Sequence, residues 1–203
     1  MAIVADTSAD AIRSDLQAAG NGLTELLLQL PTDSRAAVVG TAGPTLLQPI
    51  TKDVTAALRA LERVSPAGTA SPGAALLIAA RQVASAPRLH RAVLVVGSAG
   101  IAQRENEIAD ATLGAQTSGT QVYLVGGGVP GSSALRAALA ATGGTAYSVL
   151  ADPLGPYDAL AADMANRYRL TFPMPMSRTA VTVRVNATGV IGTAGSIVDP
   201  LLQ

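Results

Sequence analysis

The chain has 203 residues, 49% of them apolar, and its 14 lysines and arginines balance 14 aspartates and glutamates. A chain of this length buries roughly 70% of its extended surface, so its core needs neither disulfides nor a structural metal. Zero net charge and very few aromatic residues argue against nucleic-acid binding, the absence of cysteine excludes thiol and zinc–thiolate chemistry, and no apolar run approaches the length of a membrane span.

The first half of the sequence alternates short apolar runs with amphipathic stretches, a pattern typical of strands that alternate with helices. Pro31 ends the first helical pattern, Gly43-Pro44 marks a hairpin turn, and Ser71-Pro72 has the form of a helix start. The predicted elements are strands over Ile3–Ala5, Ala36–Val39 and Thr45–Ile50, and helices over Ala9–Leu30, Val54–Val64 and from Pro72 onward.

The second half repeats this alternation and then changes style beyond Arg169. The predicted elements are strands over Ala92–Val96, Gln121–Val125 and Thr145–Leu150, helices over Gln103–Gln116, Ser132–Ala141 and Tyr157–Tyr168, and strands over Leu170–Phe172 and Ala180–Val185. We therefore predict a three-layer α/β fold, a doubly wound and mostly parallel sheet with helices on both faces. Residues 1–168 form this fold, and residues 169–203 are expected to be a C-terminal β-strand extension of the same domain.

Polar residues concentrate in three loops that follow predicted strands or precede a predicted helix. These loops are Asp6–Asp10, Gly68–Ser71 and Gly97–Gly100. Ligands of such sheets bind beyond the carboxyl ends of the strands, where the loops converge. We therefore expect the three loops to meet in one polar pocket.

The motif Asp6-Thr7-Ser8-Ala9-Asp10 resembles the Asp-x-Ser-x-Ser sequence of the von Willebrand factor type A family, which is part of a metal-ion-dependent adhesion site. Further motifs that resemble the family follow in the family's order: Gly68-Thr69-Ala70-Ser71, Ala92–Val96, Val122–Gly128, Thr142-Gly143-Gly144 with Ala146-Tyr147, and Tyr168–Pro173. This resemblance extends over nearly the whole chain and implies the same α/β fold.

The resemblance also implies a cation site, although two of its positions depart from the family. Asp10 stands where the family has serine, and Ser98 stands where it has aspartate. The implied ligands are Asp6, Ser8, Asp10, Thr69 and Ser98, and they offer two carboxylates and three hydroxyls for Mg²⁺ or Ca²⁺. If Asp10 coordinates directly, the irregular site favours Ca²⁺; if it cannot turn inward, the site is a relic.

The same residues also have structural interpretations. Thr7-x-x-Asp10 has the form of a helix-start capping box, and Ser71 before Pro72 has the form of a helix cap. Ser98, in a turn among glycines, could hydrogen-bond only to the local backbone.

Two classes of function follow from these patterns. The resemblance implies a non-catalytic, adhesion-type module for protein–protein interaction, assisted by a divalent cation. The alternative is a nucleotide-binding enzyme that uses the glycines of Gly126–Gly131 for phosphates and Asp152 for a ribose. The single histidine, His90, precedes a strand at the end away from the expected pocket, so we predict no enzyme.

The expected partner is an unidentified protein, with no nucleic acid and no direct insertion into a membrane. We expect the chain to be a domain cut from a larger bacterial polypeptide, with an added methionine and any targeting segment outside it. The resemblance suggests that this polypeptide belongs to the cell envelope.

Overall fold

The computed structural model describes residues 1–11, 13–86, 90–97, 101, 103–127, 132–150, 152–165, 179–187 and 190–198. The chain divides into two compact units, Met1–Arg167 and Tyr168–Gln203. The first unit contains the polar loops, and its sheet fixes their positions.

A six-stranded sheet forms the middle of the first unit. Its strands are β1 (Ala2–Ala5), β2 (Ala36–Gly40), β3 (Thr45–Thr51), β4 (Ala92–Gly97), β5 (Gln121–Gly126) and β6 (Ala146–Ser148). They lie in the order β3-β2-β1-β4-β5-β6, with β3 antiparallel to β2 and every other pair parallel. The strand order reverses direction around β1 and β4, where open α/β sheets place their ligands.

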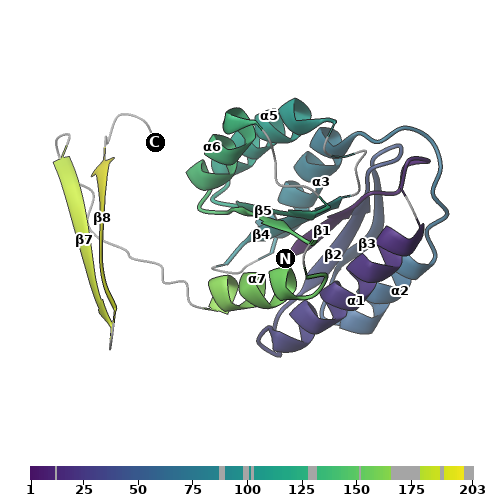
Figure 1. Cartoon of the computed structure of the whole chain (residues 1–203), viewed down its shortest axis with the longest axis horizontal. Helices are drawn as coiled ribbons and strands as arrows, with labels where there is room; N and C mark the ends of the chain where they lie inside the picture. Colours follow the sequence, from purple (N-terminus) through teal and green to yellow (C-terminus); the bar gives the residue numbers. More distant parts are fainter. Residues whose placement is uncertain are drawn as a thin grey trace. The chain divides into compact units, whose positions relative to one another are not determined.

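Helices cover both faces of this sheet (Figure 1). They are α1 (Arg13–Gln29), α2 (Val54–Glu62), α3 (Pro72–Ala84), α5 (Glu105–Gln116), α6 (Ser133–Ala141) and α7 (Gly155–Ala165). Helices α3, α5 and α6 pack on one face, and α1, α2 and α7 pack on the other. The prediction of a three-layer, mostly parallel α/β fold is therefore confirmed.

The central strands are apolar along their whole length because both of their faces are covered. All four residues of β1 are buried, and so are the first five residues of β4. Successive side chains of β1 point to opposite faces, so Val4 joins the core under α3 while Ile3 joins the core under α1. Among the described helices, none is long and apolar enough to span a membrane.

The first helix begins later than the sequence pattern suggested. Residues 8–10 form a turn in which the N–H of Ala11 donates to the carbonyl oxygen of Ser8 (3.0 Å), and the helix begins at Arg13. The apolar spacing that begins at Ala9 therefore includes a non-helical turn. Periodicity alone cannot separate such a turn from a first helical turn.

The second unit contains a β-hairpin made of β7 (Thr179–Ala187) and β8 (Val190–Val198). The predicted strand over Ala180–Val185 lies within β7. The predicted strand over Leu170–Phe172 lies outside the described residues. The assignment of residues 169–203 to the same domain as the sheet stays a prediction.

The crossing of α1 and α7 depends on a glycine. A methyl group at Gly22 would lie 2.1 Å from Cε2 of the buried Tyr157 ring, whereas one at Gly20 would meet nothing within 4 Å. We predict that Gly22→Ala lowers the free energy of unfolding by about 1–3 kcal/mol through overpacking. Gly20→Ala is the matched control in the same helix, and it should raise this free energy by up to about 1 kcal/mol through helix propensity. Urea unfolding of both variants measures the difference; equal effects would contradict the close packing.

The burial of Tyr157 also predicts a pH dependence. Burial raises the pKa of the Tyr157 hydroxyl well above its ordinary value of 10.0. Above about pH 10 the unfolded chain loses this proton while the folded protein keeps it, so the free energy of unfolding falls as the pH rises. Tyr157→Phe should weaken this fall between pH 9 and pH 11 in chemical denaturation. An unchanged slope in the variant would contradict the burial of the hydroxyl.

Candidate functional site

A buried carboxylate lies at the carboxyl end of β1. Asp6 is 2% exposed, and its Oδ1 accepts hydrogen bonds from the Ser8 N–H (3.1 Å), the Ser8 hydroxyl (2.7 Å) and the Thr41 hydroxyl (3.1 Å). Ser8 is itself fully buried. A buried charge is tolerated when such donors surround it, so these bonds offset its loss of hydration.

The sheet register brings Thr41 to Asp6. Strands β1 and β2 are parallel and pair Ala5 with Gly40, so the residues that follow these two leave the sheet side by side. The Thr41 hydroxyl donates to Asp6 and accepts from the N–H of Thr7 (3.1 Å). The Thr41 carbonyl accepts from the N–H of Ser71 (2.9 Å). Thr41 therefore connects the end of β1 to the loop before α3.

Sequence reasoning missed Thr41. A polar residue directly after the second apolar strand was a usable signal, because parallel strands end at the same edge of the sheet. Thr41 belongs to no metal-binding motif, so no local pattern marks it.

Two of the three expected loops do meet. The N–H of Ala67 donates to the carbonyl of Thr7 (3.0 Å), and the N–H of Ala9 donates to the carbonyl of Gly68 (2.9 Å). Gly68 has a φ of +70°, a backbone conformation that favours glycine. The loops that begin at Asp6 and Gly68 therefore form one hydrogen-bonded unit.

The third loop is described only as far as Gly97. Strand β4 runs beside β1, and the N–H of Asp6 donates to the carbonyl of Val96 (3.2 Å). The end of β4 thus lies next to Asp6. Ser98 lies outside the described residues, so its place in the expected pocket stays a prediction.

The implied metal ligands separate into buried and exposed residues. Asp6 and Ser8 lie together and are buried, whereas Asp10 and Thr69 are exposed. In the described part of the chain, no group of three acidic, histidine or cysteine residues could hold a metal. Oxygen donors of the Asp6 and Ser8 type are those that Mg²⁺ and Ca²⁺ use, and Mg²⁺ needs only one or two carboxylates besides water. The donor types therefore fit a hydrated cation.

The structural interpretations of the same residues have mixed outcomes. The Thr7 hydroxyl accepts a hydrogen bond from the N–H of Ala42 (2.9 Å), not from a helix start, so the predicted capping box is wrong. It fails because the turn over residues 8–10 separates Thr7 from α1. Ser71 is the N-cap residue of α3 with Pro72 behind it, as predicted, although its hydroxyl makes no capping bond to that helix.

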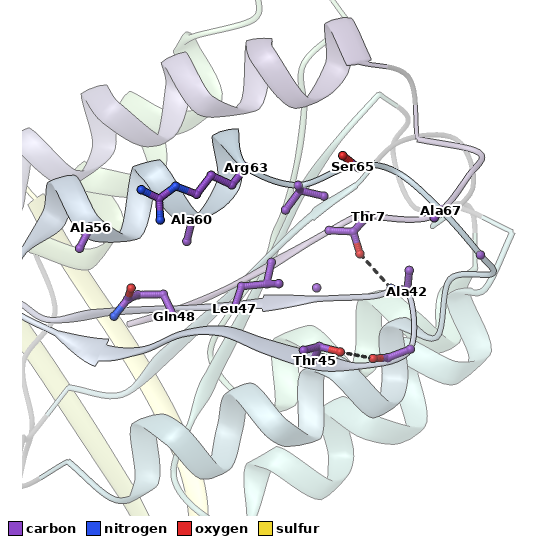
Figure 2. Close-up of a pocket in the computed structure, with 14 residues that line it drawn as sticks. Thr7, Ala42, Thr45, Leu47, Gln48, Ala56, Ala60, Arg63, Ser65 and Ala67 are labelled. Atoms are coloured by element: carbon purple, nitrogen blue, oxygen red, sulfur yellow. Dashed lines mark hydrogen bonds between the residues drawn. The ribbon is translucent and has the colours of Figure 1, made fainter.

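A groove of about 620 Å³ opens beside the two joined loops (Figure 2). Its walls are α2 and β3, and it reaches Thr7 and Gly68 at one end. Sequence reasoning did not predict this groove, because its lining consists mainly of small and apolar residues that carry no recognisable motif.

The residues of the nucleotide hypothesis have local structural roles where they are described. Gly126 ends β5, and residues 128–131 lie outside the described residues. Asp152 accepts a hydrogen bond from the N–H of Leu154 (3.0 Å), and bonds from the N–H groups of Gly155 and Leu154 lower the pKa of its carboxyl group below the ordinary 3.8. The carboxylate therefore stabilises the start of α7. His90 is exposed.

We predict that Thr41→Val lowers the free energy of unfolding by about 2 kcal/mol, because it leaves the buried N–H of Thr7 without its acceptor and removes one of the donors to Asp6. Thr45→Val is the matched control on the same hairpin. The Thr45 hydroxyl bonds to the Gly43 carbonyl at an exposed position, where water can replace it, so the change should stay within about 0.5 kcal/mol. Denaturant unfolding compares the two, and equal losses would refute the role of Thr41.

Comparison with known proteins adds a family and a set of similar folds. The family model for the von Willebrand factor type A domain matches residues 1–101. The comparison with curated proteins gives no significant match.

Several solved structures are similar to the chain. The conserved hypothetical protein BatB from Bacteroides thetaiotaomicron is 22% identical, with a TM-score of 0.62 over 82% of this chain and 98% of that one. A von Willebrand factor type A structure from Catenulispora acidiphila is 18% identical, with a TM-score of 0.63 over 97% of this chain and 54% of that one. The vWF domain of the type V pili tip protein Mfa5 from Porphyromonas gingivalis is 12% identical, with a TM-score of 0.60 over 84% of this chain and 97% of that one. At these identities the likeness establishes the fold.

Proposed function

Because this chain belongs to the von Willebrand factor type A domain family, we propose that it is a non-catalytic module that binds another protein. The observation that carries the proposal is the buried Asp6 carboxylate, which accepts three hydrogen bonds from Ser8 and Thr41. These bonds fix the carboxyl ends of β1 and β2 to each other, and the Thr41 carbonyl, which accepts from the N–H of Ser71, joins them to the loop before α3. Fixed loops lower the ordering cost of binding, which suits a recognition surface.

The non-catalytic part of the proposal is supported by the way the site uses its polar groups. The Ser8 and Thr41 hydroxyls both donate to Asp6, and the Thr7 hydroxyl accepts from the backbone of Ala42. Each of these groups thereby has a structural partner within the chain. Ser8 and Thr41 are also fully buried, whereas a catalytic nucleophile must be open to its substrate.

Cation assistance is the finer part of the proposal. Asp6, Ser8 and Thr69 would hold the ion, Asp10 would add a second carboxylate, and Ser98 would add a hydroxyl where the family has aspartate. A bound cation would supply positive charge for an acidic group of the partner. The chain's own contribution is to hold Asp6 and Ser8 together, with the Ser8 hydroxyl 2.7 Å from the carboxylate.

The Mfa5 domain belongs to a pili tip protein, which supports a cell-envelope setting for this chain as well. We place the chain outside the cytoplasm as one domain of a larger polypeptide. Its partner in that setting would be another protein, bound through the loops around Asp6.

The cation is tested by titrating Mg²⁺, Mn²⁺ and Ca²⁺ into the wild type and Asp6→Asn in a calorimeter. Asparagine keeps an oxygen that accepts from Ser8 and Thr41 and removes the charge, so this variant should lose only about 1 kcal/mol of stability. Asp6→Ala would lose about 3 kcal/mol, since it leaves buried donors without an acceptor. We expect binding heat in the wild type and at least a tenfold weaker affinity in Asp6→Asn. Absence of heat with all three cations would remove the cation from the proposal.

The interaction role has a separate test. Immobilised wild type should retain a protein from an extract of the source cells that immobilised Thr41→Val, with its loosened loops, retains less. A chelator in the wash shows whether retention needs the cation. If both forms retain the same proteins in equal amounts, the loops around Asp6 are not the binding surface.

A further inference from the structure

The groove beside the joined loops has a specific shape and composition. Residues Ala56 and Ala60 of α2 line one wall, and Leu47 and Gln48 of β3 line the other. Its volume of about 620 Å³ lies within the range of about 300–1,000 Å³ typical of binding pockets. The small side chains of α2 leave this space open between the helix and the strand.

Among the described residues that line the groove, Arg63 alone is charged. Its side chain extends along α2 over Ala60 (Figure 2). Arg63 is exposed, and no salt bridge in the described part of the chain involves it. Arg63 also lines a second groove, between α1 and α2, whose lining includes Glu62, whereas no carboxylate of the described chain lines the groove between α2 and β3.

The chemistry of the lining favours an acidic ligand. A guanidinium group presents its N–H donors in a planar fork that matches a carboxylate, and the paired hydrogen bonds are roughly twice as strong as neutral ones. Leu47, Ala56 and Val64 add apolar surface suited to small aliphatic side chains. The lining therefore complements a segment that has a carboxylate among small apolar groups.

The position of the groove connects it to the Asp6 site. Thr7 and Gly68 line one end of the groove, and both belong to the loops that Asp6 and Thr41 hold together. A protein bound over these loops would thus cover the end of the groove. A segment of the same protein could enter the groove without bridging a gap.

We propose that the groove between α2 and β3 binds an acidic, extended segment of the partner protein, whose carboxylate pairs with Arg63. This inference rests on the proposed function and names the chemistry of the partner. The Arg63 guanidinium supplies the positive charge and fixes the orientation of the bound segment. The apolar walls select small side chains next to the acidic residue. The specificity for the partner protein then comes from the groove beside the Asp6 site, and this contact requires no cation.

Two labelled peptides test the inference on the whole chain. One is a hexapeptide that alternates valine and glutamate, and its control alternates valine and glutamine. Fluorescence anisotropy measures their binding at low ionic strength. We expect the glutamate peptide to bind at least tenfold more tightly than the glutamine peptide, and more weakly as salt is added.

Variants on α2 locate the binding. Arg63→Gln should weaken binding of the glutamate peptide at least tenfold, and Arg63→Lys should weaken it less. Arg59→Gln removes an exposed charge from the same helix but not from the groove, so it should leave binding within twofold of the wild type. Equal losses in Arg63→Gln and Arg59→Gln, equal binding of the two peptides, or no binding of the glutamate peptide would each overturn the inference.

The outcomes distinguish this inference from the function on which it rests. If the glutamate peptide fails to bind while wild type still retains a protein that Thr41→Val does not, the groove inference falls and the interaction module stands. If the peptide binds through Arg63 but no protein depends on the Asp6 loops, the groove is an acid-binding site and the proposed surface is wrong.

Discussion

The end of the sheet depends on one buried carboxylate. Asp6 is almost fully buried, so its charge is compensated by the donors of Ser8 and Thr41. Those donors belong to two different strand ends, and Thr41 in turn holds the start of α3 through Ser71. The cost of burying a charge is thereby offset by bonds that also fix the loops. Removing either the charge or its donors would loosen these loops rather than break a single contact.

The sheet makes this arrangement possible through register. Because β1 lies between β2 and β4, the carboxyl ends of all three strands lie at one edge, and Asp6 can reach Thr41 on one side and the carbonyl of Val96 on the other. Strands β1, β2 and β4 contain no polar side chains, so the polar groups of the candidate site come from residues that follow the strands. The groove under α2 extends the same surface with a charge of the opposite sign, Arg63.

The sequence predicted the fold well because its signals were strong and local. Continuous apolar runs at β1 and β4 are typical of strands covered on both faces, and Pro31 and Pro72 marked helix boundaries. The candidate site was predicted only in part, because Thr41 acts through the register between β1 and β2, which no local motif encodes. The capping box failed for a related reason: Thr7 finds its partner at Ala42, 35 residues away. The groove was not predicted because it arises from the small size of its lining residues. These residues leave space between α2 and β3 but form no recognisable motif.

The central claim is that Asp6 and Thr41 hold the loops at the end of the sheet in one arrangement. Amide hydrogen exchange measured by NMR tests it most directly, through the N–H groups of Thr7, Ser8 and Ser71, which bond to Thr41 and Asp6. The account predicts that these three amides are protected and open together, with similar free energies. Exchange of Thr7 and Ser8 at the rates of an unstructured loop, while β1 stays protected, would contradict it.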